Sequence, residues 1–181
     1  MLEFYHGASF NAGFEVKANE NFGFYAEFGK YLPQSPVANN YDQSGYTVSA
    51  EVKRYFKPDK SSVRTYFSAQ YMQGEHAYTR TDIIGYYNDG EEDLLLYDID
   101  KTFKDLSLKL GVVLIHKKRW TFDPYMGLGI RHHFIESTID EISASELIWE
   151  KASYAHRWIH DPGKKTYLKA HLGIRIGLRI F

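Results

Sequence analysis

The fifteen residues before the terminal Phe181 alternate strictly between apolar and polar positions. In an extended strand one face would carry only apolar side chains, those of Leu168, Ala170, Leu172, Ile174, Ile176, Leu178 and Ile180. The opposite face would carry Lys169, His171, Gly173, Arg175, Gly177 and Arg179. An uncharged apolar face backed by Arg, Lys and Gly is typical of a transmembrane β-strand, with lipid on one side and a polar lumen on the other.

Six further segments alternate in the same way, and the connections between the segments differ in length. The segments are residues 10–17, 22–29, 46–53, 63–71, 106–114 and 120–134. Short connections lie near 18–21, 57–61 and 116–119, and long ones lie near 32–43, 75–102 and 136–165. This alternation of short and long connections is typical of a barrel with short periplasmic turns and long external loops.

The direction of these seven strands predicts an eighth. If the C-terminal strand runs inward to the periplasm, the segment 8–17 also runs inward, and an even number of strands requires an outward strand before it. We therefore expect an all-β, antiparallel up-and-down transmembrane β-barrel of the eight-stranded type, formed as one domain by residues 1–181, with its first strand missing or truncated. Residues 2–6 lack the features of a signal peptide, so we expect the native signal to be missing too. The alternative is an irregular first strand within residues 1–8.

Alternation alone does not say which face lies inside, because a soluble barrel has the same pattern with the faces exchanged. The glycines favour a polar interior, since Gly weakens a solvated strand but makes room for long side chains inside a narrow barrel. We expect charges of both signs to neutralise one another in a lumen network of Glu15, Glu27, Glu51, Lys53, Arg64, Lys109, Arg131 and Arg175. The alternative is a soluble or periplasmic barrel that binds an apolar ligand.

Composition narrows the function classes further. The 15 Tyr and 12 Phe suit strands and the aromatic girdles of membrane barrels. The absence of Cys excludes disulfides, zinc–thiolate sites and thiol nucleophiles. A net charge of -1 without a basic run predicts no nucleic-acid partner. No stretch approaches the 18 consecutive apolar residues that predict a transmembrane helix. Membrane-spanning β-strands alternate and would not be detected by this criterion.

Two segments resemble the small outer-membrane β-barrels, the class of the transmembrane domain of outer membrane protein A, and especially the uncharacterised short barrels of Bacteroidetes. Residues 120–132, Trp-Thr-Phe-Asp-Pro-Tyr-Met-Gly-Leu-Gly-Ile-Arg-His, are similar to their penultimate strand, and residues 171–181 resemble their closing strand. Phe181 departs from that pattern because it is in register with Arg179 rather than with the apolar positions. The resemblance implies a place in the bacterial outer membrane, in contact with its lipid, and specifies architecture rather than activity.

One cluster invites a catalytic interpretation, because some outer-membrane lipid hydrolases use Ser, His and a carboxylate. It consists of His132, His133, Glu136 and Ser137. Adjacent histidines on a strand point to opposite faces, so at most one could serve as a base. We therefore expect a non-enzymatic protein, with a lipid hydrolase as the less favoured alternative. The acidic segment 88–93 lacks the spacing of a calcium loop, so we expect neither metal nor cofactor.

The long connections are expected to carry the function, because loops on a rigid scaffold are free to bind. Residues 143–146 resemble a helix-capping box followed by apolar residues at helical spacing, which predicts a short helix over 145–159. The equally weighted alternative extends the flanking strands beyond the membrane. We expect a structural, adhesive or accessory-subunit role, with contact to an envelope protein or glycan through Asp89, Glu91, Glu92, Asp93, Trp149, Tyr154 and Trp158.

Overall fold

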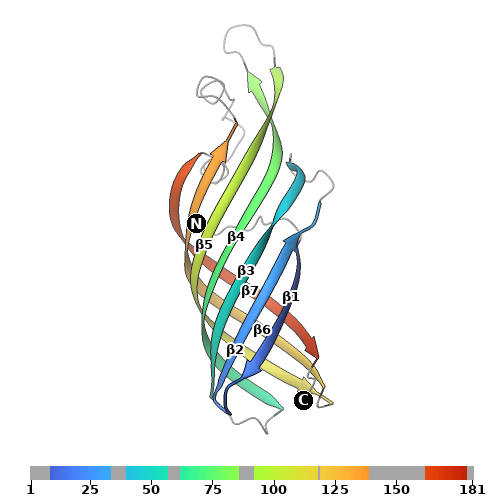
Figure 1. The fold of residues 1–181 in the computed structure, drawn as a ribbon, viewed down its shortest axis with the longest axis vertical. Coiled ribbons are helices and arrows are strands. Elements are labelled where there is room, and N and C mark those ends of the chain that lie inside the picture. Colours follow the sequence, from blue (N-terminus) through green and yellow to red (C-terminus); the bar gives the residue numbers. More distant parts are fainter. Residues whose placement is uncertain are drawn as a thin grey trace.

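A computed structural model describes residues 9–33, 40–56, 62–85, 92–117, 119–138 and 162–178. These residues form seven β-strands, drawn in Figure 1: β1 (Ser9–Lys17), β2 (Phe22–Tyr31), β3 (Asn40–Tyr55), β4 (Val63–Gly85), β5 (Glu92–His116), β6 (Trp120–Ser137) and β7 (Gly163–Leu178). The described part of the chain holds no helix long and apolar enough to cross a membrane.

The strands form one antiparallel sheet in which each strand pairs with its neighbours in sequence, in the order β1 to β7. The prediction of seven alternating antiparallel strands is therefore confirmed. Figure 1 shows the sheet rolled about its long axis. The rolling brings Arg175 in β7 to within 3.7 Å of Glu27 in β2. Within the described residues no pairing joins β1 to β7, so the sheet keeps two edges.

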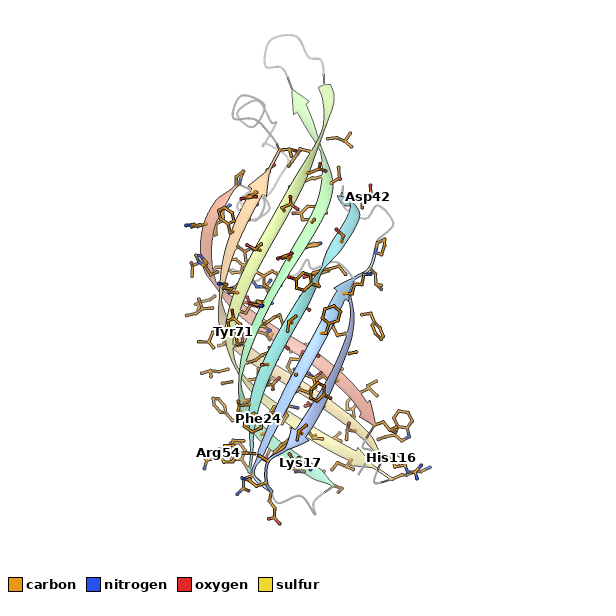
Figure 2. All side chains as sticks on the ribbon, in the orientation of Figure 1. Lys17, Phe24, Asp42, Arg54, Tyr71 and His116 are labelled. Carbon is orange, nitrogen blue, oxygen red and sulfur yellow. The ribbon has the colours of Figure 1, made fainter. Side chains whose placement is uncertain are left out.

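Tight turns at the lower end of Figure 1 set the register of two hairpins. The backbone N–H groups of Asn21 and Phe22 donate to the Asn19 side-chain oxygen, at 2.9 and 3.0 Å, which is the local hydrogen bonding that makes Asn a turn residue. In the β5–β6 turn the Arg119 N–H donates to the His116 carbonyl at 3.1 Å, and Lys117 adopts a φ of 48°. Lys17, Arg54 and His116 all lie at this end (Figure 2).

The expected loop over residues 75–102 is wrong. β4 and β5 stay in register from Glu75 opposite Thr102 to Gly85 opposite Glu92, so most of that stretch is a two-stranded extension of the sheet. Glu92 and Asp93 accordingly belong to a strand rather than to a loop. The reason is that the outward positions here are polar, as at Thr79 and Asp98, so the stretch lacks the apolar stripe by which the other strands were recognised.

The other two long connections are shorter than expected, because β3 begins at Asn40, β6 ends at Ser137 and β7 begins at Gly163. Near the start of β3 the pairing with β4 shifts by one residue, with Asp42 at a φ of 50°. This β-bulge bends the strand and increases its twist. The helix expected at 145–159, the terminal Phe181, and the contact candidates Asp89, Glu91, Trp149, Tyr154 and Trp158 lie outside the described residues.

Candidate functional site

The side chains of the lower part of the sheet divide by face, except at the β1 edge, where both faces are exposed, and at the outward Arg54 near the lower end. Outward positions are apolar and exposed, with Leu172 at 87% and Leu128 at 69% exposure, and inward positions are charged and buried, with Lys53 and Arg131 at 1%. The faces are those that the sequence predicts for a polar interior. The buried inward residues at this level are mostly charged groups and tyrosines, so the described interior does not offer an apolar lining.

We call the exposed apolar side chains of this part the outer belt. It comprises Phe14, Val16, Phe22, Phe24, Phe28, Val48, Val52, Val63, Phe67, Tyr71, Leu106, Leu108, Leu110, Leu114, Trp120, Phe122, Met126, Leu128, Ile130, Leu168, Leu172, Ile174, Ile176 and Leu178. Phe24 and Tyr71 are labelled on it in Figure 2. A contiguous apolar area spread over all seven strands far exceeds the patches that water-exposed proteins leave uncovered.

The belt ends at a row of polar residues that crosses four strands. Gln73 lies opposite Lys104, Lys104 opposite His132, and His132 opposite Thr166, so these four residues form a continuous boundary row over β4, β5, β6 and β7. Directly below it, Tyr71, Leu106 and Ile130 are exposed members of the belt. On these four strands the change from apolar to mostly polar outward residues therefore begins at this row.

Above the boundary row the same strands carry mostly polar residues outward, beside the exposed Leu96 and Phe134. Asp98, Asp100 and Glu136 are exposed there, and the Thr79 hydroxyl donates to the Asp98 carboxylate at 2.7 Å. An apolar cluster of Tyr78, Tyr97, Ile99 and Ile135 now lies buried on the inner face, beside Arg80 and Lys101. The outward face thus changes character along single strands that keep their register.

Near the lower end of the interior, a lysine joins three strands. Lys53 Nζ lies 2.9 Å from Glu15 Oε2 and 2.9 Å from Asp123 Oδ2, which links β3 to β1 and β6. The Tyr55 hydroxyl donates to Glu15, and the Tyr66 hydroxyl donates to Asp123 at 2.9 Å. Each carboxylate therefore meets both a cation and a phenol, which is how buried charges are compensated.

The middle level is centred on Arg175. Its Nη2 donates to Glu51 Oε2 at 2.7 Å, and its Nε lies 3.7 Å from Glu27 Oε2, so β7 is tied to β3 and β2. Lys109 Nζ is 3.6 Å from the same Glu51 oxygen. The Arg175 guanidinium lies over the rings of Tyr25 and Tyr125, at 4.2 and 4.6 Å from their centroids.

The next level is organised by Asp105, which the predicted network lacks. Arg131 donates to both of its oxygens, at 2.5 and 2.6 Å, and Lys169 Nζ lies 3.2 Å from Oδ2. Close by, the Ser107 hydroxyl and His171 Nε2 are 2.8 Å apart. A bidentate Arg–carboxylate pair with a second cation is among the strongest ionic arrangements in proteins.

Seven of the eight predicted network residues lie in ionic contacts, and Arg64 stacks on the Tyr55 ring at 3.8 Å. The structure adds Asp105, Asp123 and Lys169, together with the tyrosines. Their position in the alternation was the available signal, because Asp105 and Lys169 share an inward face with Lys109 and Arg175.

Two inward glycines make room for tyrosine rings. A Cβ added to Gly111 would lie 2.3 Å from Cζ of Tyr66, its direct partner on β4, and one added to Gly173 would lie 2.5 Å from Cζ of Tyr125 on β6. These rings lie flat over the neighbouring backbone and reach the charged groups at the centre. Glycine on the inner face is therefore a packing requirement here.

The histidine pair at 132–133 splits between the two faces. His132 is outward and exposed, with Nδ1 2.7 Å from Thr166 Oγ1, whereas His133 is buried, with Nε2 2.9 Å from the Tyr167 hydroxyl. Glu136 and Ser137 lie higher on β6, and Ser107 pairs with a different histidine, His171. Among the described residues, no group of three or more His, Asp or Glu is arranged to hold a metal ion.

Above the boundary row, His76 is stacked between two tyrosines. Its ring centroid lies 4.3 Å from that of Tyr31 and 4.9 Å from that of Tyr78. Burial, and secondly the positive charge of Lys101, lower the pKa of His76 to about 4. The imidazole is therefore neutral at neutral pH and packs as an aromatic ring.

Comparisons with models of known protein families, with curated proteins and with solved structures gave no match. The functional conclusion consequently rests on the geometry of the chain itself.

Proposed function

We propose that this chain is an outer-membrane β-barrel without enzymatic activity, which serves as a structural, adhesive or accessory subunit of the bacterial envelope. The observation that carries the proposal is the change of the outward face at the boundary row. Below the row the outward positions of β4 to β7 are almost all apolar, whereas above it the same strands expose mostly charged groups and hydroxyls, with Leu96 and Phe134 as apolar exceptions. A strand that leaves lipid and enters water has this pattern.

The height of the outer belt supports a membrane crossing. On β5 the belt runs from Leu106 to Leu114, which is nine residues, and on β7 it runs from Leu168 to Leu178, which is eleven. A tilted transmembrane strand needs about 9–11 residues to cross the hydrocarbon core. The belt therefore matches a bilayer in extent as well as in chemistry.

Closure of the barrel would come from one further strand. In a seven-stranded meander β1 and β7 run in the same direction, so an antiparallel closure requires a strand of opposite direction between them. Coverage of the interior falls toward these edges, because the inward Asn11 and Gly13 of β1 are exposed whereas Ser68 and Gln70 of β4 are buried. An eighth strand from outside the described residues would cover that side and leave no open edge in lipid.

The partners of this barrel would be outer-membrane lipid around the belt and an envelope protein or glycan at the upper end. The interior favours a scaffold over a channel or an enzyme, because its charges are engaged with one another. The contact surface would then comprise the β4–β5 extension and the two upper connections that follow β4 and β6, where the acidic and aromatic contact candidates lie.

The proposal is tested by refolding the chain with phosphatidylcholine vesicles. We expect an SDS-resistant folded form whose mobility shifts on heating, and protection of the belt segments from protease. A chain that reaches the same compact state in buffer without lipid or detergent would contradict the membrane assignment.

A second arm tests where partners bind. Residues 75–102 and 139–161 are each replaced by an Asn-Gly turn, which keeps the belt and the boundary row on β6 and β7. Folding should survive the exchange and recovery of cross-linked envelope partners should be lost. If partners are still recovered, the interaction surface is the lipid-facing wall, and the chain is a membrane-embedded subunit docked side to side.

A further inference from the structure

A shallow groove of about 300 Å³ opens where the outer belt ends. It spans four strands, and its lining comprises Tyr46, Gln73, Gly74, Glu75, Thr102, Phe103, Lys104, His132 and Phe134. Three members of the boundary row, Gln73, Lys104 and His132, thus line one concave site. Because these three are direct cross-strand neighbours, their side chains stand side by side.

The polar groups of this groove are arranged as donors. The Gln73 side-chain oxygen accepts from the Tyr71 hydroxyl at 3.2 Å, which leaves the Gln73 amide NH₂ to donate. His132 Nδ1 lies 2.7 Å from the Thr166 hydroxyl, so Nε2 is the ring nitrogen left for the groove, and it donates when Nδ1 accepts from that hydroxyl. Among the described residues no carboxylate forms an ion pair with the Lys104 ammonium. Ammonium, amide and imidazole together suit a phosphate oxygen.

The single acid in the groove lining already has a donor. Glu75 lies directly opposite Tyr46, whose hydroxyl donates to the Glu75 carboxylate. Glu75 also stands above the boundary row, whereas Lys104 lies in it. The cationic side of the groove is therefore the side that adjoins the outer belt.

Directly beneath the donors the surface is apolar. Tyr71, Leu106 and Ile130 form the adjacent row of the belt, each two residues along its strand from Gln73, Lys104 and His132 and on the same outward face. A ligand that fits both rows has a phosphate headgroup joined to hydrocarbon chains. Free phosphate would use the upper row alone.

We propose that this groove is a binding site for the phosphate headgroup of a membrane lipid, held by Lys104, His132 and Gln73, with the acyl chains lying on Tyr71, Leu106 and Ile130. The proposal rests on the membrane assignment made above. It places the headgroup level of the bilayer at the boundary row, on the side from which the β4–β5 extension projects.

The test uses the refolded chain in a neutral glycoside detergent and native mass spectrometry with two lipids of identical acyl chains. One is phosphatidylglycerol, and the other is a diacylglycerol with an uncharged galactose headgroup. The wild type should retain phosphatidylglycerol about tenfold more tightly than the galactolipid, the scale of one charge-assisted hydrogen bond. Lys104→Gln should remove about that tenfold preference.

Arg54→Gln is the matched control, because Arg54 is an exposed outward cation of β3 at the opposite end of the belt (Figure 2). It removes the same charge and should leave the preference unchanged. Equal retention of the two lipids by the wild type, or equal losses in both variants, would overturn the site. Displacement of phosphatidylglycerol by excess inorganic phosphate would show that the groove recognises a free anion, which also contradicts a lipid site.

These outcomes are separable from failure of the membrane assignment. If the chain does not insert into vesicles at all, both the membrane assignment and the lipid site are contradicted. A chain that inserts normally but retains both lipids equally removes only the lipid site.

Discussion

The lower and upper parts of β4, β5 and β6 share strands, register and backbone pairing, yet they present opposite surfaces. Below the boundary row the exposed residues are apolar, such as Leu106 and Leu108, and the buried ones are charged, such as Lys109. Above it, Asp98 and Asp100 are exposed on the same face of β5, and Ile99 is completely buried. Under the proposed membrane assignment, the medium outside the sheet differs between the two levels.

The comparison also separates two ways of filling a narrow interior. In the lower part, ion pairs and tyrosines fill it, and a buried pair needs every partner in place. In the upper part, an apolar cluster with Ile99 and Ile135 lies inside, and the outward face is mostly polar. Substitutions should therefore lower the stability of the folded protein for different reasons at the two levels.

The largest effect is expected inside the lower part. Asp105→Asn leaves Arg131 and Lys169 buried beside a neutral amide and should destabilise the folded protein by about 3–5 kcal/mol. The measurement is urea unfolding in vesicles. Asp98→Asn, at an exposed site of the upper part, should cost less than about 1 kcal/mol. Equal losses of unfolding free energy in the two variants would contradict the distinction between the ionic interior of the lower part and the exposed face of the upper part.

A second prediction concerns the outer face of β5. Leu108→Arg puts a charge in the middle of the belt and should cost roughly 2–4 kcal/mol in a bilayer. Thr102→Arg, on the same face above the boundary row, should be nearly neutral. If both variants unfold at the wild-type urea concentration, the belt does not face hydrocarbon.

The third prediction is a pH dependence of the upper part. The pKa of folded His76 is about 4, below the 6.5 of an unperturbed histidine, so the unfolded extension binds more protons between these values. Its stability should be complete above pH 6.5 and fall by at most roughly 3 kcal/mol as the pH drops to 4. Hydrogen exchange of β4 and β5 amides above the row measures this. His76→Gln should flatten the profile, and an unchanged profile in that variant would exclude His76 as its cause.

The smallest expected effect is an absence of conduction. A barrel of about eight strands is just wide enough for its own side chains, and Arg175, Lys53 and Asp105 with their partners occupy the interior. Planar bilayers containing the protein should stay at baseline conductance. Steady, large single-channel steps would show that the ionic network does not fill the lumen.

The sequence predicted the belt because strands with an apolar outward face leave a period-2 apolar stripe, as in Leu172, Ile174 and Ile176. It missed the upper halves of β4 and β5 because a strand with a polar outer face and a mixed inner face, such as Thr79 beside Tyr78, carries no such stripe. It also missed Asp105 and Asp123 as network centres. Alternation assigns a face, but the partner across the interior depends on how the sheet rolls.

The most direct test of the account is a cysteine scan of β5 in vesicles, which the absence of native Cys makes clean. Single Cys residues at outward positions 98, 100, 102, 104, 106, 108, 110, 112 and 114 are spin-labelled, and their collision rates with oxygen and with a water-soluble nickel complex are compared. We predict nickel access at 98–104, a reversal across the boundary row, and oxygen access with little nickel access at 106–114. Uniform nickel access along all nine positions would contradict the claim that the outer belt lies in a membrane.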